Sequence, residues 1–561
     1  MFKKFARFVV PLLVLVFLIG ACKPTPETAT PTEPQEVTEV EATEVVESEA
    51  EATEEATEVV PTEEAEPRVF TIAIPVEVTN IDPAFTNDWQ SSVVGRGVYD
   101  PLFRARGDPI QNEPWIVESY EVNDDLTVWT LHLRPGLTFH DGSPITAEAV
   151  KYSFDRYMAL QGGYAFLWAT ITDENTVRVV DELTVEFTLT QPFTPFISTL
   201  AAIYVVNPTV VQAHEVDGDW GKAWLLDHEA GSGPYTISRW EPGSIYELTR
   251  LPEHWAGFPY ENGIEIFRYM VYRDTSSARL ALEAGEIDWF PGLTEEDYTL
   301  LEGKEGISTL TRPTLTVDWL FMNTAGEGPI GDVNVRMALR HAYDYAASDA
   351  LLFDIIPLNY IMPSALPGAI EYPDLQKTDL DLAREYLAAS AWPEGGFDID
   401  YVYIGGYTPE EDAGLVLLEA AAELNITVNM VSKTWGEMVQ MCSDTQTVPD
   451  MINIFLGMIY ADPYPYLAES FTTSVALGYG TCHNYLSEAL SDKIEQASTE
   501  PDEAVRLQLY TEIQNELYES AFGIMVGSVD FIEAYNNHWQ TDSHTPLFAY
   551  TGWLTDYYYV P

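Results

Sequence analysis

Two short runs hold the side chains that most suggest catalysis. His140 stands beside Asp141, a pairing able to move protons, and Ser232 lies between two glycines. Pro234 follows the serine run at once and would block the helix that a nucleophile elbow requires, so we interpret that run as a tight turn. A glycine also follows Asp141, which favours a turn there. We therefore predict no catalytic residue in either run.

Cofactor and metal patterns are also weak. The nine histidines are scattered, and no His-x-x-x-His pair or Cys-x-x-Cys spacing occurs. Gly95-Arg96-Gly97 lacks the third glycine of a dinucleotide-binding loop, because Asp100 stands at that position. We predict neither a metal site nor a cofactor.

The elements around His140 can be predicted from their periodicity. Alternating apolar residues between Trp129 and Leu133 indicate a half-buried strand, and 137–139 indicates a second short strand. Thr146 can cap a following helix that has an apolar face. The stretch from Glu118 to Arg156 therefore reads as strand, turn, strand, turn and amphipathic helix.

The same stretch resembles the signature of family 5 extracytoplasmic solute-binding proteins, the peptide-, nickel- and oligosaccharide-binding receptors of ABC importers. Further runs are similar to family motifs, at 80–84, 98–103, 231–235, 281–288, 319–324 and 332–344. The signature residues are Trp129, Leu133, Arg134, Pro135, Gly136, Phe139, His140, Asp141, Gly142, Pro144, Thr146, Ala147, Glu148, Val150, Tyr152, Ser153 and Phe154. The resemblance covers about residues 69–561 and implies an α/β, type II periplasmic-binding-protein-like fold with two lobes around a ligand cleft.

Length and charge are compatible with such a receptor. The chain has 561 residues and a formal net charge of −62, which excludes nucleic acid as a partner because a polyanion would be repelled.

The resemblance implies lobe I at 68–314, with a small subdomain at about 105–228, lobe II at 315–520, and a return to lobe I at 521–561. A β-α-β unit over 401–431, a helix over 496–518 and strands over 523–531 are expected within these bounds.

The N-terminus predicts export. Three basic residues precede an apolar stretch that is too short to span a membrane, and Ile19-Gly20-Ala21-Cys22 resembles a lipobox. We expect a signal peptide at 1–21, lipid attachment at Cys22 and an acidic disordered tether at 22–67. The alternative is an ordinary signal peptide with an incidental cysteine. Either interpretation predicts export, and lipid attachment would make the protein a cell-envelope lipoprotein that faces the periplasm or the cell exterior.

Two cysteines remain beyond the lipobox, Cys442 and Cys482. An even pair in an exported protein allows one disulfide, which would close a loop of about 40 residues and stabilise the fold by roughly 3–4 kcal/mol. Two buried free thiols are the alternative.

The cleft must be inferred from family likeness. In peptide-binding relatives an aspartate after the apolar strand of lobe II pairs with the α-ammonium of the ligand. Here Asp462 precedes Pro463 and better matches a second, structural aspartate, so both ligand contact and a loop cap stay open. The other ligand-binding candidates, each alternatively a core residue, are Phe85, Asn87, Asp88, Trp319, Phe321, Asn323, Trp435, Tyr460 and Tyr464.

These observations favour a monomeric, lipid-anchored receptor that delivers an oligopeptide to an ABC permease and ATPase complex. An oligosaccharide could replace the peptide, since aromatic side chains also stack on sugars. A tethered extracellular glycoside or peptide hydrolase is the alternative of a different class, and a surface sensor or scaffold is a third. The receptor is not expected to be an enzyme.

Overall fold

The computed structural model describes residues 66–86, 89–475, 477–541, 543–547 and 552–561. These form one compact unit, which begins at Ala65. The predicted signal peptide, tether and Cys22 lie outside the described residues, as do Asn87 and Asp88.

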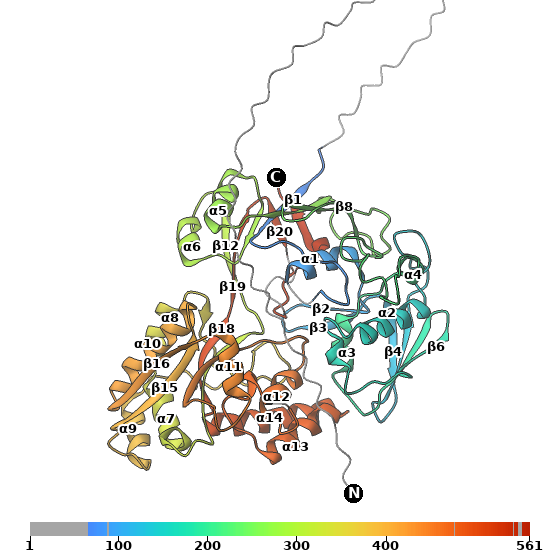
Figure 1. Cartoon of the computed structure of the whole chain (residues 1–561). Coiled ribbons are helices and arrows are strands. Elements are labelled where there is room, and N and C mark those ends of the chain that lie inside the picture. Colours follow the sequence, from blue (N-terminus) through green and yellow to red (C-terminus); the bar gives the residue numbers. More distant parts are fainter. Residues whose placement is uncertain (1–65, 87–88, 476, 542, 548–551) are drawn as a thin grey trace, which may run out of the picture. The chain divides into compact units, whose positions relative to one another are not determined.

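The first lobe is built on a mixed sheet that has seven strands within the described residues (Figure 1). β1 runs parallel to β10 and β11, and the remaining neighbours are antiparallel. Helix α1 (Trp89–Val98) packs on β8 and β9, while α5 (Thr275–Ala284) and α6 (Glu295–Leu301) pack on β11, β12 and β19. In sheet order the strands are β12 (Ile307–Arg312), β19 (Phe531–Asn536), β11 (Trp289–Pro291), β1 (Val69–Ile74), β10 (Ile266–Val271), β9 (Ile245–Arg250) and β8 (Tyr235–Glu241).

A small subdomain of the first lobe contains the signature stretch. Its antiparallel sheet has the order β4 (Val117–Val122), β5 (Val128–Leu133), β7 (Thr184–Thr188), β6 (Val177–Asp181). The apolar residues of β5 are alternately buried, as predicted, and α2 (Ala147–Leu160) packs on β6 and β7. Thr146 occupies the N-cap position of α2 but makes no side-chain cap bond. The predicted strand at 137–139 is wrong, because only Thr138 pairs, in an isolated bridge with Pro144.

Short elements complete the first lobe. They are β2 (Phe103–Arg106), β3 (Gln111–Pro114), α3 (Phe196–Thr199), α4 (Pro208–Ala213), β20 (Trp539–Thr541) and β21 (Tyr557–Tyr559), with 3-10 turns η1 (Ala165–Leu167), η2 (Leu200–Ala202) and η5 (Leu554–Asp556).

The second lobe has a six-stranded sheet within the part of the chain that the structure describes. The predicted β-α-β unit is confirmed, because β15 runs parallel to β16 and α10 connects them. In sheet order the strands are β14 (Ile355–Ile356), β18 (Gly523–Val529), β13 (Val317–Met322), β17 (Met451–Leu456), β15 (Phe397–Ile404) and β16 (Ile426–Lys433).

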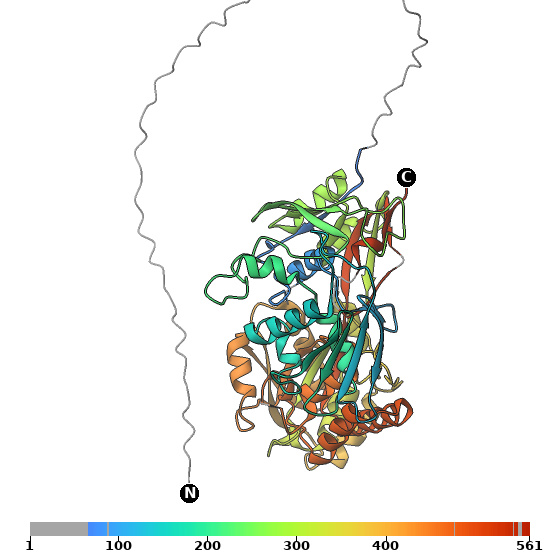
Figure 2. The ribbon, with the colours of Figure 1, turned by 90° about the vertical axis from the view of Figure 1, so that its right-hand side faces the viewer.

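Helices cover both faces of this sheet (Figures 1 and 2). One core lies under α7 (Val333–Ala342), α8 (Tyr345–Leu351), α9 (Leu380–Ala389) and α10 (Thr408–Ala422). The opposite core lies under α11 (Trp435–Cys442), α12 (Pro463–Phe471), α13 (Glu488–Thr499) and α14 (Glu503–Ser520). Two 3-10 turns, η3 (Pro329–Gly331) and η4 (Tyr479–Thr481), also belong to this lobe. The single helix predicted at 496–518 is wrong: Pro501 separates α13 from α14, since proline cannot continue a helix hydrogen-bond ladder.

The chain passes between the two large sheets at 313–316 and again at Asp530. Val529 donates its N–H to the Thr316 carbonyl at 2.9 Å, and the Thr314 hydroxyl donates to the Val529 carbonyl at 2.6 Å, so the two crossings are side by side. The predicted return at 521 is therefore too early. β18 still pairs with β13 and β14 of the second lobe, and six of its seven residues are buried, as suits a central strand.

Candidate functional site

A cavity of about 60 Å³ lies where the loop that follows β17 meets the first lobe. Ile459 is the wall from the second lobe. The other described lining residues come from the loop before α1, from α1, from β2, from Tyr164, from the segment that runs from α3 to Tyr204, and from the C-terminal segment. Apolar and small residues line the cavity together with hydroxyl-bearing and aromatic side chains, among them Tyr164, Tyr204 and Trp553. Arg96 is the one acidic or basic residue among its described lining, so the site suits a partly apolar solute that carries an anionic or carbonyl group.

Arg96 projects from α1 and is 8% exposed. It hydrogen-bonds the hydroxyl of Tyr204. Burial raises the pKa of that hydroxyl, and the Arg96 charge opposes the rise. Both side chains therefore present hydrogen-bonding groups to the cavity at neutral pH, one cationic and one neutral.

The loop before α1 is fixed by the signature helix. Arg156 of α2 forms a two-pronged ion pair with Asp82, with both nitrogen–oxygen distances at 2.5 Å and both side chains almost wholly buried. Asp82 also accepts the N–H of Ala84 at 3.0 Å. Gly163 (φ +51°) approaches this loop so closely that a Cβ there would lie 2.7 Å from the Ala84 carbonyl. The recognisable stretch thus positions the cleft loop without itself lining the cavity.

Asp462 caps helix α12. Its carboxylate accepts the N–H of Tyr464 at 2.9 Å and the hydroxyl of Tyr510 at 3.0 Å, and it pairs with Arg506 at 3.0 Å. Burial raises the pKa of Asp462, and Arg506 opposes the rise. These three contacts support the loop-cap interpretation. They leave little capacity for an ammonium group.

The aromatic residues on either side of Asp462 contact the first lobe. Tyr460 is buried in the core of the small subdomain. Tyr464 meets Phe193 edge to face, with ring centroids 5.5 Å apart, and its hydroxyl donates to Glu495. The Thr194 N–H also donates to the Ser498 carbonyl at 2.7 Å. These predicted site residues join the lobes rather than line the cavity.

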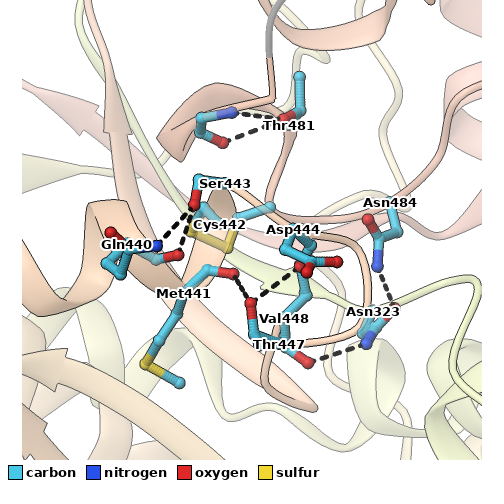
Figure 3. The surroundings of a disulfide bond; sticks show 12 residues. Asn323, Gln440, Met441, Cys442, Ser443, Asp444, Thr447, Val448, Thr481 and Asn484 are labelled. Atoms are coloured by element: carbon cyan, nitrogen blue, oxygen red, sulfur yellow. Dashed lines mark hydrogen bonds between the residues drawn. A yellow bond between two sulfur atoms is a disulfide. The ribbon is translucent and has the colours of Figure 1, made fainter. Parts of the chain in front are cut away.

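Three candidates on or after β13 belong to the core. Trp319 is 1% exposed and donates its indole N–H to the Tyr466 hydroxyl at 3.1 Å, and Phe321 is fully buried. Asn323 donates to the Val448 carbonyl and accepts from Asn484 (Figure 3). β13 lies between two strands and under helices on both faces, so none of its side chains reaches a cleft.

Trp435 and Phe85 are more accessible. Trp435 is 49% exposed and lies 5.4 Å from Tyr479, centroid to centroid. Phe85 is half-buried, with the Lys222 ammonium 4.2 Å from its ring centroid.

Cys442 and Cys482, the pair expected to bond, form a disulfide that ties α11 to the residue after η4 (Figure 3).

His140 lies in a structural network rather than beside a nucleophile. Its Nδ1 pairs with Glu229 at 2.7 Å, and its Nε2 contacts the Gly233 carbonyl at 2.9 Å. Burial opposes protonation of His140, but Glu229 outweighs it and raises the pKa. The Ser232 hydroxyl donates to Asp100. His140 and Asp141 lie in a turn, as the sequence predicts, whereas the Ser232 run has a bend in place of the predicted tight turn. The two runs contact each other, because the His140 N–H donates to the Gly231 carbonyl at 3.0 Å.

The described residues contain neither a metal-binding cluster nor a membrane-spanning helix. No group of three or more His, Cys, Asp or Glu side chains there is placed to hold a metal ion. No helix in the described ranges is long and apolar enough to cross a membrane.

Sequence reasoning missed Arg96, Tyr164, Tyr204 and Trp553 as lining residues. Arg96 was considered only within a failed dinucleotide motif, and the others lie in loops without periodicity. Their shared position comes from chain segments that are at least 40 residues apart, a separation that no local pattern encodes.

Two α/β lobes, two adjacent crossings and a cavity at the lobe junction define a type II periplasmic-binding fold. The chain belongs to the bacterial extracellular solute-binding proteins, family 5, whose model (family 5 Middle) matches residues 111–477, more than half of the chain.

Individual relatives are more distant. The chain is 30% identical over 271 residues to the probable D,D-dipeptide-binding periplasmic protein DdpA of Escherichia coli (strain K12), covering 47% of this chain and 51% of that one. It is 27% identical over 332 residues to the glutathione-binding protein GsiB of Shigella flexneri, covering 58% and 62%. The matched part thus spans about half to three fifths of these relatives. The solved structure of HbpA2 from Haemophilus parasuis has a TM-score of 0.78 at 21% identity and covers 88% of this chain and 100% of that one.

Proposed function

We propose that the protein is an extracytoplasmic receptor that captures an oligopeptide between its lobes and delivers it to an ABC importer. The observation that carries this proposal is membership of the family 5 solute-binding proteins, with two relatives named for binding a dipeptide and glutathione. The cavity chemistry agrees, because a peptide offers carbonyl and carboxylate groups to Arg96 and side chains to the aromatic walls.

The structure weakens the support for an oligosaccharide as the solute. That support rested on the aromatic content and on the altered Asp462 loop, and two of the aromatic candidates, Trp319 and Phe321, are core residues, although Trp435 is 49% exposed. Stacking on sugars requires open ring faces. A peptide is therefore the better-supported solute class.

Capture requires the lobes to separate. A cavity of about 60 Å³ holds a few water molecules, whereas sites for small molecules typically measure ~300–1,000 Å³. The two crossings at 313–316 and Asp530 are the natural hinge, since they alone join the large sheets within the described residues.

We further propose that Cys22 carries a lipid anchor and that the importer supplies a permease and an ATPase.

The test is ligand identification. Mass spectrometry of the denatured protein would name a co-purified solute, and thermal shifts with peptides of two to five residues would then be compared with shifts from oligosaccharides. A peptide at 100 times its dissociation constant should add about 2.7 kcal/mol to the free energy of unfolding. Stabilisation by oligosaccharides alone, or turnover of the added peptides, would overturn the proposal.

A further inference from the structure

Three acidic side chains gather beside the crossings between the lobes. Asp318 follows the crossing at 313–316 as the second residue of β13, and by strand alternation it lies with Leu320 on the face that α7 to α10 cover. Glu410 belongs to the first turn of α10 on that face, and Asp354 lies in the loop between α8 and β14. Glu410 and Asp354 are close enough for their charges to act on Asp318. We call these three acids the hinge acid cluster.

The cluster is buried without a cation. Asp318 is 0% exposed and Glu410 is 1% exposed, and none of the three acids has a basic group among the described neighbours that shift its pKa. Burial of an ionised carboxylate without such a partner is strongly unfavourable. Burial, followed by the charges of Glu410 and Asp354, therefore raises the pKa of Asp318 well above its usual value. Burial also raises the pKa of Asp354, and it raises that of Glu410 to about 7.

The hydrogen bonds of Asp318 also favour a proton. Asn453 of β17 donates its side-chain N–H to Asp318 Oδ1 at 2.9 Å. Asp318 Oδ2 and Asn453 Oδ1 are buried, and neither has a hydrogen-bond partner among the described groups. A proton on Asp318 Oδ2 converts one of these two acceptors into a donor, whereas ionisation leaves both unpartnered. The three acids are not placed to hold a metal ion, since no such group of three occurs among the described residues.

Tyrosines face the cluster from three neighbouring elements. Tyr343 follows α7, Tyr401 lies on β15 and Tyr407 precedes α10, and the charge of Asp318 acts on all three. Burial raises their pKa values, so all three stay neutral near pH 7. The Tyr401 hydroxyl donates to the backbone carbonyl of Glu410 at 2.7 Å rather than to its carboxylate. A titration near neutral pH therefore belongs to the carboxyl groups rather than to these tyrosines.

The loop that carries Asp354 connects the cluster to both crossings. The Asp354 carbonyl accepts the N–H of Asp530, which is the second crossing, at 2.9 Å. The Asp530 carboxylate accepts the N–H of Thr314 in the first crossing, and burial raises the pKa of Asp530 to about 6. Phe353, one residue before Asp354, meets Tyr298 of α6 in the first lobe edge to face, with ring centroids 5.3 Å apart. Movement of this loop therefore disturbs the crossings.

We infer that the hinge acid cluster holds this loop in place while it is protonated and releases the loop when it ionises, so that ambient pH sets the mobility of the hinge. Each ionisation sends one proton to solvent and leaves a negative charge beside the other carboxyl groups. Like charges repel strongly where water is excluded, and a movement of the loop takes Asp354 away from the other two acids. A mobile hinge releases the solute sooner. That last step rests on the proposed receptor function, whereas the control of the hinge by the cluster does not.

The first experiment tests the cluster without any solute. Hydrogen exchange of the full chain is followed by mass spectrometry at pH 6 and pH 8, and the protection of peptides that contain the two crossings is corrected for the intrinsic exchange rate at each pH. Wild-type protection should fall roughly tenfold from pH 6 to pH 8, as expected for a carboxyl group whose pKa drops from about 7 to its ordinary value when the loop opens.

Two variants assign this change. Glu410→Gln should keep its protection at pH 8, because the amide stays neutral and its oxygen can still accept the Ile404 N–H. The matched control is Glu419→Gln, an equal charge change at an exposed position on α10, which should behave like the wild type. Equal pH dependence in all three proteins would overturn the proposal.

A second measurement covers the case in which Glu410→Gln perturbs the fold. The carbonyl stretch of protonated carboxyl groups is recorded by infrared spectroscopy at pH 7. Wild-type protein should show this band, and Asp318→Asn, which keeps the neutral shape of the side chain, should remove one component of it. An unchanged band in the folded variant would mean that Asp318 is ionised, which contradicts the inference.

A third experiment separates the cluster from the receptor role. The dissociation rate of tri-alanine is measured by stopped-flow tryptophan fluorescence at pH 6 and pH 8. Wild-type protein should release the peptide faster at pH 8, and Glu410→Gln should lose that difference. If both proteins release tri-alanine with the same pH dependence, the role of the cluster is wrong and the receptor stands. If hydrogen-exchange protection depends on Glu410 but no peptide of two to five residues binds, the cluster stands and the peptide receptor is wrong.

Discussion

Asp462 and Glu469 lie at opposite ends of one nine-residue helix, α12, and have opposite surroundings. Asp462 is buried at the favoured N-terminal end, where a backbone N–H, Tyr510 and Arg506 consume its hydrogen-bonding capacity. Glu469 lies in the last turn of the helix, where the helix dipole disfavours negative charge, and its side chain is exposed. The first carboxylate stabilises the fold, whereas the second faces solvent. The two residue types alone would not distinguish the surroundings of these two carboxylates.

The largest effect should come from Asp462→Asn. The change removes the charge partner of Arg506, which is only 14% exposed, and weakens the helix cap. Breaking a buried pair on one side typically costs 3–5 kcal/mol. Chemical denaturation should therefore show a loss of about 3–5 kcal/mol. A loss below 1 kcal/mol would erase the contrast with Glu469.

Removal of the disulfide should be nearly as costly. Its partners are 40 residues apart in sequence, and a loop of that length corresponds to about 4 kcal/mol in the chain-entropy account. Cys442→Ser with Cys482→Ser should lower the free energy of unfolding by roughly 2–4 kcal/mol. Urea denaturation of the folded double variant measures the change. An unchanged free energy of unfolding would show that α11 and η4 need no such tie.

Stability should depend on pH through the hinge acid cluster, in a defined direction. Burial raises the pKa of Glu410 to about 7, so the folded protein binds this proton more tightly than the unfolded chain does. The contribution of the proton to stability is complete below the ordinary pKa of the group and is lost as pH rises through about 7. Chemical denaturation from pH 5 to pH 8 should therefore show a declining free energy of unfolding in wild-type protein. Glu410→Gln should give a flatter profile, and an equal slope would assign the titration to another group.

The smallest effect should be that of Glu469→Gln on stability. The change removes a negative charge from the C-terminal turn of α12, where such charges cost about 0.3–1 kcal/mol. The ligand-free variant should therefore be as stable as the wild type or slightly more stable at pH 8 in thermal melts. A marked loss of stability would reveal a structural role like that of Asp462.

Much of the second lobe could be predicted from local pattern. The β-α-β unit and the buried strand β17 follow from apolar runs of the right length and period. The helix break at Pro501 and the late return at Asp530 were missed. Strand β18 is apolar enough for either sheet, and only its pairing with β13 assigns it to the second lobe.

The candidate site could be predicted less well. Tyr460 and Tyr464 lie at the lobe junction as family likeness suggested, but they pack rather than line the cavity. Trp319 and Phe321 occupy the strand that the sequence predicts, yet the helices α11 to α14 on one face of the sheet bury them. Burial on that face depends on elements more than 100 residues away in the sequence, which periodicity does not report.

The sequence by itself determined the family, the two-lobed α/β class and most of the secondary structure, because these depend on short-range periodicity, turn residues and a long signature. Only the tertiary structure decided which acids are partnered, which aromatic rings are open and where Arg96 and Asp318 lie. These properties depend on the field and packing of distant segments: Arg506 reaches Asp462 from 44 positions away, whereas no cation among the described residues pairs with Asp318. That difference in partners separates a carboxylate that stabilises the fold from the carboxyl group that we propose holds a proton at the hinge.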